Sequence, residues 1–406
     1  MMKNTFHLGF IGLGARNCVY ARNLREQFGD TIRIDAVCDV NEKKLHDFKE
    51  RYCHRNTALY KDYVRLVKER HDLDGFLIAP PNYLHEKIAI PFLERGVTIL
   101  LEKPLAHTRE SCMNIARVYN KSASRVTMVF VLRYTPFYRT IMKLLREEKL
   151  GKIKVLNADE VVGPVLSSVF FRTWRGKKEC TGNLLLEKCC HDLDLINKML
   201  EVDPIRVTAF SSDSSYRARE GYGPQCGACK YNDSCAFSTI LWEKEIDAGE
   251  DNGEYEYVDF SDDLCVYNDD HDVEDRQSQL IEYDGQILVY FNVTLGGNDT
   301  RRTIDIIGTK GRLFGDFREN RILFYKIGSS IPEEIRIEHE KSGHGGGDSV
   351  ITRSFIRSLE DPNYVPEAGV KDALKSALLS FVCDRSRDEN KVIPVDYLDE
   401  IQSMRD

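Results

Sequence analysis

Apolar residues in the first 130 positions follow two alternating patterns. Short, nearly continuous apolar runs at 6–11, 33–38, 74–79 and 97–101 predict buried strands. Between these runs, apolar residues recur at helical spacing, which predicts helices at 19–28, 42–52, 60–70, 85–94 and 108–120. Alternating strands and helices are typical of a parallel sheet with right-handed crossovers. We therefore expect residues 1–130 to form a Rossmann-type α/β domain, in which 126–132 continues or ends the sheet.

The pattern changes after residue 133. Two helices, at 138–149 and 183–200, are followed by strands at 153–162 and 205–210. Later strands follow one another without helices, at 279–283, 286–295, 302–308, 311–316 and 321–325, and glycine turns between them favour antiparallel pairing. Helices at 349–359 and 370–387 end the pattern. We expect residues 131–406 to form an α+β domain with one large, mostly antiparallel sheet and a cysteine-rich, acidic insertion at about 215–275.

The first strand ends in the glycine-rich turn Gly12-Leu13-Gly14-Ala15-Arg16. A turn of this kind lets the backbone approach the pyrophosphate of a dinucleotide at the N-terminus of the next helix. Asn17 stands where the usual G-x-G-x-x-G pattern has its third glycine, so an ordinary tight turn is the alternative. Asp39, after the second strand, is placed to accept hydrogen bonds from a ribose and to repel a 2′-phosphate. The pattern favours NAD, while Arg16 leaves NADP as the alternative.

Two further groups carry candidate chemistry. Glu102-Lys103-Pro104 places a lysine at the carboxyl edge of the sheet, where ligands of open α/β sheets bind. On a helix spanning 183–200, Glu187, His191 and Asp194 share one face. A carboxylate one turn away can fix the imidazole tautomer, and the histidine can then take a proton from an alcohol. The alternative is a charge pair on a surface helix, but the leucines around it favour burial.

Composition excludes several classes of function. The formal net charge is −8, which argues against non-specific nucleic-acid binding. Much of the negative charge lies between residues 243 and 275, with fifteen aspartates and glutamates against one lysine. The longest apolar run has seven residues, whereas a membrane span needs about 20. Because the first strand starts near residue 6 without a signal peptide and the twelve cysteines are scattered, we expect a cytoplasmic protein.

In these motifs the chain resembles the Gfo/Idh/MocA family of sugar and inositol oxidoreductases. The matching segments, in the family's order, are Gly12–Arg16, Asp39, Ala79-Pro80-Pro81-Asn82-Tyr83-Leu84-His85, Glu102-Lys103-Pro104, Arg133-Tyr134-Thr135-Pro136 and His191-Asp192-Leu193-Asp194. One departure is Glu187, because the family commonly has an aspartate four residues before the histidine. The resemblance implies a two-domain subunit that binds its substrate between the domains.

The resemblance also implies roles for individual residues. Lys103 would contact the reacting hydroxyl and the nicotinamide ribose, and His191 would be the general acid/base, assisted by Glu187. The expected cofactor residues are Gly12, Gly14, Ala15, Arg16, Asp39, Pro81, Asn82, His85, Glu102 and Lys103. The expected substrate residues are Lys103, Arg133, Tyr134, Lys188, His191 and His344. For Asn82 and His85 the alternative is an ordinary turn that begins a helix.

These observations predict an NAD(P)-dependent oxidoreductase that acts on a secondary hydroxyl of a sugar, sugar derivative or inositol. Two alternatives remain open on the same fold, namely a nicotinamide-dependent glycosidase without net cofactor reduction and a non-catalytic dinucleotide-binding sensor. The expected partner is a small sugar or polyol, not a nucleic acid or membrane. The resemblance implies a homodimer or homotetramer.

Two motifs lie outside this scheme. Cys226, Cys229, Cys235 and Cys265 have a spacing that suggests a structural zinc site, with His271 as a substitute ligand; reduced loop cysteines without metal are the alternative. In the glycine-rich turn 344–348, His344 could face the substrate. We expect Asp348 to cap the helix that follows.

Overall fold

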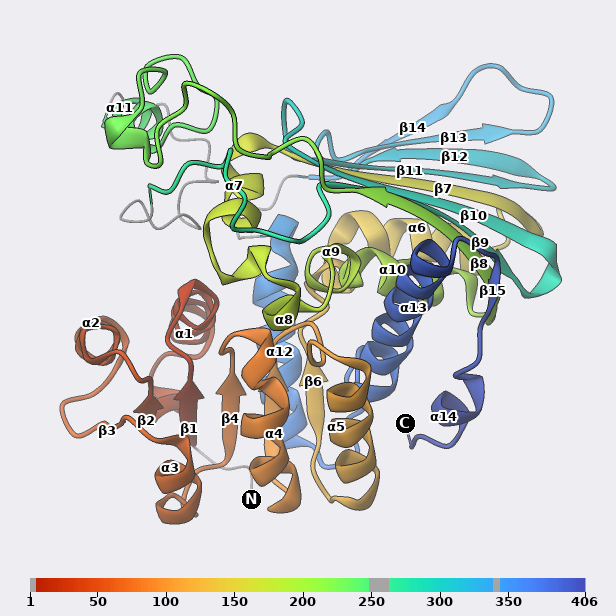
Figure 1. Ribbon diagram of the computed structural model, residues 1–406. Helices are drawn as coiled ribbons and strands as arrows, with labels where there is room; N and C mark the ends of the chain where they lie inside the picture. Colours follow the sequence, from red (N-terminus) through yellow and green to blue (C-terminus); the bar gives the residue numbers. More distant parts are fainter. Residues whose placement is uncertain (1–4, 248–262, 339–343, 406) are drawn as a thin grey trace.

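The N-terminal part of the chain folds around a parallel sheet. The structure, a computed structural model, describes residues 5–247, 263–338 and 344–405. Six strands pair in the order β3-β2-β1-β4-β5-β6 (Figure 1). β4 and β5 are buried along their whole length, as expected for strands covered by helices. The strands are β1 (Phe6–Ile11), β2 (Ile32–Cys38), β3 (Ala58–Tyr60), β4 (Gly75–Ile78), β5 (Thr98–Leu101) and β6 (Val126–Met128).

Three of the helices that connect these strands, α2, α3 and α5, begin at polar caps. The side chains of Asn41, Asp62 and Thr108 each accept a backbone N–H of the first helical turn. The predicted helix at 60–70 is shorter than expected, and the short strand β3 before it was not predicted. Its three residues are too few for a period-2 pattern to be read. The helices are α1 (Ala15–Phe28), α2 (Glu42–Tyr52), α3 (Tyr63–Glu69), α4 (His85–Glu94) and α5 (Arg109–Lys121).

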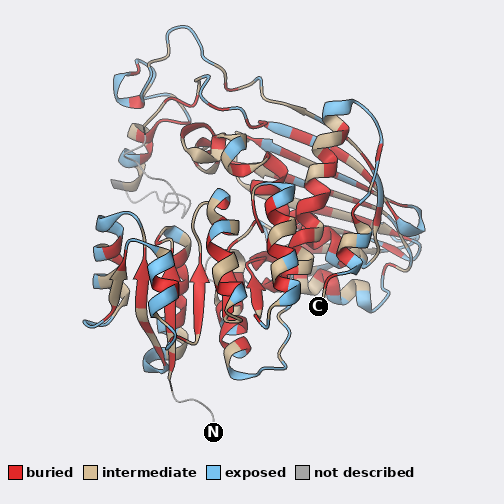
Figure 2. Cartoon of the chain, turned by 60° about the horizontal axis from the view of Figure 1, so that its bottom comes forward, coloured by how far each residue is buried: buried red, intermediate tan, exposed pale blue. Residues whose placement is uncertain are grey.

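A helix from the C-terminal part completes this first layer. α12 (Gly347–Glu360) packs against α1. Its Ile351 and Phe355 share one apolar core with Leu8 and Phe10 of β1. Buried residues are concentrated on the strands and on the faces of the helices that turn toward the sheets (Figure 2). In space, the first core therefore also contains α12, which comes from far beyond the predicted boundary at residue 130.

The second part is a mixed, mostly antiparallel sheet of nine strands in the order β14-β13-β12-β11-β7-β10-β9-β8-β15. β7 and β10 run parallel, and the other neighbouring pairs run antiparallel. The predicted fold class is thus confirmed for both parts. The strands are β7 (Ile153–Val162), β8 (Pro204–Ser212), β9 (Arg276–Tyr283), β10 (Ile287–Leu295), β11 (Arg301–Gly308), β12 (Gly311–Asp316), β13 (Arg321–Lys326), β14 (Glu333–Arg336) and β15 (Ile393–Pro394).

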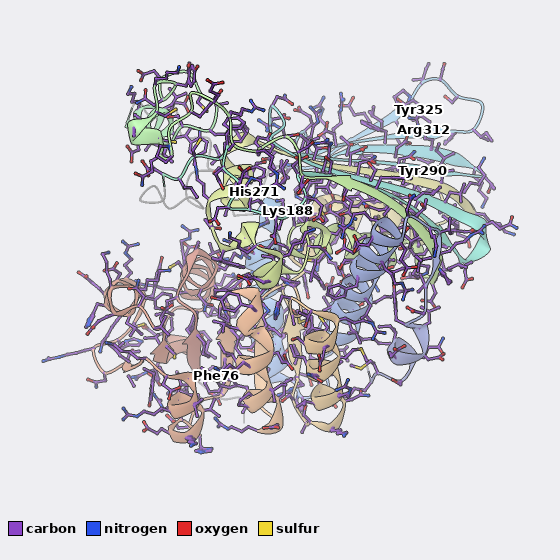
Figure 3. All side chains as sticks on the ribbon, viewed as in Figure 1. Phe76, Lys188, His271, Tyr290, Arg312 and Tyr325 are labelled. Atoms are coloured by element: carbon purple, nitrogen blue, oxygen red, sulfur yellow. The ribbon has the colours of Figure 1, made fainter. Side chains whose placement is uncertain are left out.

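One face of this large sheet is covered by helices and the other is open. α6 (Pro136–Arg146), α10 (Cys190–Leu200) and α13 (Val370–Glu389) lie along the inner face (Figure 1). Buried and more exposed residues alternate along β10, as expected for a half-covered antiparallel strand. Tyr290, Arg312 and Tyr325 lie on strands β10, β12 and β13 of this sheet (Figure 3).

Three short helices between β7 and β8 lie near the place where the two parts meet, and α8 contacts the turn after β4. They are α7 (Pro164–Arg172), α8 (Lys178–Thr181) and α9 (Leu184–Glu187), while α11 (Thr239–Asp247) and α14 (Leu398–Gln402) lie further along the chain. The continuous helix predicted at 183–200 is wrong. It is broken at Lys188 and Cys189 into α9 and α10, because the backbone of Cys189 leaves the helical region.

Candidate active site

The turn after β1 provides room for a ligand at a helix N-terminus. Gly12 has φ +78°, and a Cβ atom there would lie 2.7 Å from the carbonyl oxygen of Ala79 in the turn after β4. Only glycine lets these two turns lie so close. Gly14 is the N-cap of α1, and a Cβ atom there would have no other atom within 4 Å. This open space beside the first N–H groups of α1 fits the pyrophosphate of a dinucleotide.

Asn17 replaces the third glycine of the usual motif and serves the turn in another way. Its side chain is fully buried, and Nδ2 donates to the carbonyl oxygens of Ile11 (3.0 Å) and Gly12 (2.9 Å). The amide therefore fixes the end of β1 against α1, so the missing glycine does not disrupt the turn.

Asp39 is held beside the same turn. Its carboxylate accepts the backbone N–H of Leu13 (2.7 Å) and that of Asn41 (2.8 Å). These bonds orient the carboxylate at the carboxyl end of β2, next to the glycine turn. This position and charge fit a ribose with free hydroxyls.

Arg16 joins three distant segments. Its guanidinium donates to Glu102 after β5 (2.7 Å) and to Asp348 of α12 (2.5 Å), and it lies over the ring of Tyr20. Burial lowers the pKa of Arg16, but these neighbours raise it well above its usual value. The guanidinium is thus engaged by carboxylates, which does not favour its predicted alternative role as a 2′-phosphate ligand. Asp348 is not the predicted helix cap, which is Gly346; its carboxylate instead lies 2.9 Å from Nδ1 of His344.

Lys103 and Glu187 meet at the carboxyl edge of the parallel sheet. Nζ of Lys103 donates to the backbone carbonyl of Glu187 at 2.6 Å. The Glu187 carboxylate accepts the side-chain amide of Asn82, from the turn after β4, and Nε of Arg175 at 2.9 Å. Two turns of the parallel sheet and the Arg175 segment of the second part are therefore tied together at Glu187, through its carbonyl and its carboxylate.

The charges in this group support one another. Burial lowers the pKa of Lys103, but Glu187, Cys190 and Glu102 more than offset this effect, so the pKa is raised. Burial raises the pKa of Glu187, whereas Lys103 and Arg175 lower it, and the net result is a lowered pKa. Lys103 is therefore a cation and Glu187 an anion at neutral pH, with the ammonium held in place by a neutral carbonyl.

The predicted pairing of Glu187 with His191 is wrong. The break at Lys188 and Cys189 turns the Glu187 carboxylate toward Asn82 and Arg175. His191 Nδ1 is buried without a hydrogen-bond partner among the described residues. A buried ring nitrogen without a hydrogen-bond partner can form a hydrogen bond with the hydroxyl of a ligand.

His191 is surrounded by positive charge. Burial lowers its pKa well below the usual value, and the neighbouring charges of Lys103, Arg302, His344 and Lys188 lower it further. The imidazole is therefore neutral at physiological pH, which is the form that can accept a proton.

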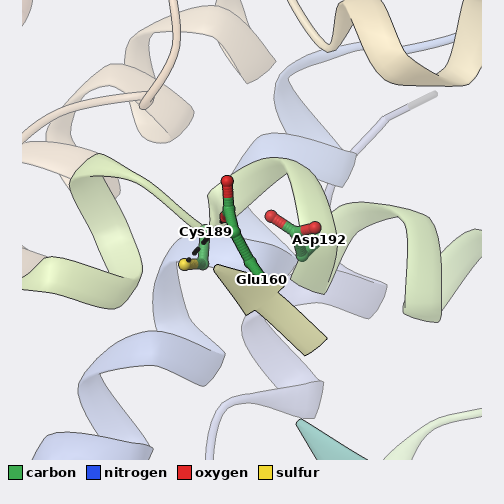
Figure 4. Close-up of side chains that lie close together, drawn as sticks. All are labelled: Glu160, Cys189 and Asp192. Carbon is green, nitrogen blue, oxygen red and sulfur yellow. Dashed lines mark hydrogen bonds between the residues drawn. The ribbon is translucent and has the colours of Figure 1, made fainter. Parts of the chain in front are cut away.

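A compact ionic group lies next to His191. Sγ of Cys189 and one carboxylate oxygen each of Glu160 and Asp192 lie within 4.8 Å of one another, and the Cys189 thiol donates to Glu160 (Figure 4). Lys188 (3.2 Å) and Arg302 (2.5 Å) both pair with Glu160, and Arg302 also pairs with Asp192. Two cations already balance these two carboxylates, so the group needs no metal ion. The predicted substrate residue Lys188 is placed here, at the edge of the His191 environment.

Arg133 and Tyr134, predicted to contact substrate, are core residues. The Arg133 guanidinium donates two bonds to Asp194 (2.5 and 2.6 Å), one to Asp372 (2.9 Å) and one to the Glu367 carbonyl (2.5 Å). Arg133 is 2% exposed, and Tyr134 is 1% exposed within the first apolar core. The Asp194 carboxylate is thus used by Arg133 and not by His191.

His85 supports the site from behind. Its two ring nitrogens lie 2.8 Å from the carbonyl oxygen of Pro104 and 3.0 Å from that of Pro80. The buried ring joins the turns after β4 and β5, and these turns carry Pro81, Asn82 and Lys103. Because both ring nitrogens are engaged by these carbonyl oxygens, His85 holds the two turns together instead of contacting the cofactor as predicted.

Arg175 and Trp174 were not predicted as site residues. The Arg175 guanidinium lies over the Trp174 ring at 4.5 Å, and this ring makes an edge contact with Tyr83 at 6.1 Å. The sequence shows only a Trp-Arg pair in a short connection, and such a pair on its own does not indicate a position next to Glu187.

The four cysteines of the insertion line one cavity. No three of their sulfur atoms lie within 4.8 Å of one another in the described part of the chain, so a closed tetrahedral set is not preformed and zinc stays a prediction. The substitute ligand His271 lies elsewhere, with Nε2 2.8 Å from the Tyr216 carbonyl oxygen. The centre of the acidic stretch, 248–262, lies outside the described residues.

Comparison with known proteins agrees with this geometry. The family description "Oxidoreductase family, NAD-binding Rossmann fold" matches residues 6–130, and its companion "Oxidoreductase family, C-terminal alpha/beta domain" matches 142–396. The chain belongs to the Gfo/Idh/MocA oxidoreductase family. The resemblance inferred from the motifs is thus confirmed.

Members of this family differ in how much of the chain they match. The protein YteT of Bacillus subtilis (strain 168) is 23% identical over 99% of this chain and 100% of its own length. An inositol 2-dehydrogenase/D-chiro-inositol 3-dehydrogenase of Shouchella clausii (strain KSM-K16) is 26% identical, over 50% of this chain and 56% of its own. A levoglucosan dehydrogenase solved with NADH and L-sorbose has the same fold, with a TM-score of 0.75 and 17% identity over 97% of this chain and 99% of its own.

As a family member, the chain is an oxidoreductase with an NAD-binding Rossmann domain. Among the described residues, no helix combines the length and apolar character needed to cross a membrane.

Proposed function

We propose that this oxidoreductase is an NAD-dependent dehydrogenase for a secondary hydroxyl of a sugar, sugar derivative or cyclic polyol. The observation that carries the proposal is the proximity of Lys103 to His191, whose ring is neutral and whose Nδ1 has no hydrogen-bond partner among the described residues. Relatives named as inositol dehydrogenases, and a structural neighbour named as a levoglucosan dehydrogenase, support a polyol or sugar as substrate.

The residues divide the chemistry between them. Bound NAD⁺ would supply the hydride acceptor beside the turns after β1 and β4. Lys103 keeps two ammonium protons for a ligand after one is donated to Glu187, and it would hold and polarise the substrate oxygen. His191 would accept the hydroxyl proton as the carbon–oxygen bond becomes a carbonyl, which leaves ketone, reduced cofactor and protonated His191.

The cofactor preference follows from Asp39 and Arg16. The carboxylate of Asp39 is oriented beside the glycine turn, and the guanidinium of Arg16 is engaged by Glu102 and Asp348. A carboxylate at this position disfavours a 2′-phosphate, and Arg16 is already bound by carboxylates, which together support NAD over NADP.

The test begins with the purified full-length chain after any bound cofactor has been removed. Calorimetric titration with NAD and NADP is followed by a panel of sugars, sugar derivatives and inositols, with NADH absorbance as the readout. Lys103→Ala and His191→Ala should each lower turnover by about 10²-fold or more while NAD still binds. Lys198→Ala, an exposed lysine on the same helix as His191, is the matched control and should be unchanged.

Three outcomes would contradict the proposal. Near-normal turnover in both variants would remove the assigned roles of Lys103 and His191. Cleavage of a glycoside without NADH accumulation would indicate the glycosidase alternative. Cofactor binding without activity on any substrate of the panel would favour the sensor.

A further inference from the structure

Four cysteines from three segments surround one small cavity beyond the catalytic residues. The cavity has a volume of about 10 Å³, close to that of one water-sized sphere. Three of the cysteines are buried, with exposed fractions of 7% for Cys226, 8% for Cys229 and 6% for Cys265. Cys235 is partly exposed, and all four are free thiols without disulfide bonds.

The backbone brings these residues together from distant positions. Residues 226–228 form a short turn of 3₁₀ helix, so that Cys229 N–H donates to the Cys226 carbonyl at 3.1 Å. An antiparallel bridge between Gln225 and Leu264 then places Cys265 beside this turn. Two backbone bonds hold it there, Cys226 N–H to Asp263 (2.8 Å) and Cys265 N–H to Pro224 (2.9 Å). The approach of Cys265 to the other three is therefore built into the fold.

A buried cation also lies against this cavity. Arg172, which is 8% exposed, lines it together with the four cysteines. Its Nη2 donates to Sγ of Cys226 at 3.3 Å. Thiolates that held a metal ion here would therefore face a fixed positive charge.

We propose that Cys226, Cys229, Cys235 and Cys265 hold one thiophilic metal ion, Zn²⁺, as a structural centre. Four thiolates are usual donors of structural zinc, and Cys226 and Cys229 have the C-x-x-C spacing typical of such sites. The cavity has room for one ion between the four side chains. Since no three sulfur atoms lie within 4.8 Å of one another, binding would draw them inward until each lies about 2.3 Å from the metal.

The position of the centre gives it a structural consequence. Arg172 ends α7, donates to the carbonyl oxygens of Leu264 and Phe237, and stands three residues before Arg175. Asp272 N–H also donates to the Gly176 carbonyl at 2.9 Å. The centre would therefore anchor the connection that presents Arg175 to Glu187, without taking part in hydride transfer.

The first experiment measures metal in the full-length protein purified without added chelator. Elemental analysis should find one zinc per chain in the wild type and in the control Cys180→Ser, whose cysteine lies outside the cavity. Cys229→Ser and Cys265→Ser should lose at least nine-tenths of it. This readout does not depend on dehydrogenase activity, so it stays informative if the proposed function fails.

A second measurement avoids variants that fail to fold. The wild-type chain is stripped of metal and titrated with Co²⁺, whose tetrahedral thiolate complex has characteristic visible absorption. Saturation at one cobalt per chain, and its displacement by Zn²⁺, would support the centre. A folded protein without stoichiometric metal in which all four thiols react with a thiol reagent would overturn the proposal. So would two disulfides found by mass spectrometry, or iron accompanied by acid-labile sulfide.

Discussion

Replacing Arg133 by methionine is predicted to destabilise the fold and to leave substrate binding largely unchanged. The side chains of Arg133 and Asp194 are 3% and 1% exposed, and two parallel hydrogen bonds join them. Removing the guanidinium leaves the Asp194 carboxylate buried without its partner. Breaking a buried pair in this way costs about 3–5 kcal/mol of unfolding free energy.

A double variant separates the pair from the rest of the site. Arg133→Met combined with Asp194→Leu removes both charges, and it should recover most of the loss because a buried pair is often replaced by apolar groups at little cost. Arg133→Lys should be intermediate, since a single ammonium cannot make the two parallel bonds. Urea unfolding followed by circular dichroism measures the differences, and NAD binding checks that each variant is folded.

The result that would refute this reasoning is specific. Suppose that Arg133→Met lowers the free energy of unfolding by less than about 1 kcal/mol but strongly raises KM for the sugar or polyol. The guanidinium then binds substrate, and the stability argument fails. Failure of the double variant to recover would show that the Glu367 carbonyl and Asp372, and not Asp194, are the important partners.

Four further predictions concern the cofactor, the base and the assembly. Gly12→Ala should weaken NAD binding at least about tenfold, and it should also lower the melting temperature because Gly12 has a positive φ. Gly14→Ala should weaken NAD binding without a comparable change in melting temperature. Equal melting temperatures of the two variants would contradict this prediction. Asp39→Ser should shift the ratio of NAD to NADP affinity toward NADP at least about tenfold by calorimetry, and an unchanged ratio would exclude Asp39 as the selector. Because the pKa of His191 is lowered, kcat/KM for oxidation should fall only well below the ordinary pKa of histidine, where the ring becomes protonated, and a loss of activity at higher pH would identify another base. We also predict a dimer or tetramer formed through the open sheet face, so that Tyr290→Glu reduces the mass measured by light scattering; a monomeric wild type would contradict this.

The sequence predicted the parts of the site that depend on local patterns. Gly12 and Gly14 follow a strand and precede a helix, and the same local pattern places Lys103 at the end of another strand. In the structure these residues lie at one edge of one sheet. Parallel topology alone brings such strand ends together, which is why their proximity could be predicted without knowledge of side-chain contacts.

The errors arise where a distant partner decides the local conformation. Helical spacing is continuous from 183 to 200, yet the backbone breaks after Glu187, whose carboxylate is bound by groups far away in the chain, Asn82 among them. Likewise, Arg16 is paired with Asp348, which is 332 residues away. Neither hydrophobic periodicity nor a short motif can reveal pairings between residues so far apart in the sequence. These pairings nevertheless determine the roles of the Glu187 and Asp348 carboxylates.

Glu187 shows how one carboxylate can link cofactor and substrate sides. Asn82 and Lys103 come from turns of the dinucleotide domain, whereas Arg175 comes from a connection that belongs to the second part. A residue that served only to orient His191 would need none of these partners. In this chain, the glutamate that replaces the family's aspartate instead places the Lys103 ammonium, through its own carbonyl, and balances the charge around it. The break between α9 and α10 makes this arrangement possible, because it turns the carboxylate toward the first domain and leaves His191 with a free ring nitrogen among the described residues. The irregular backbone is thus the feature that separates Lys103, proposed to hold the substrate oxygen, from His191, proposed to take its proton.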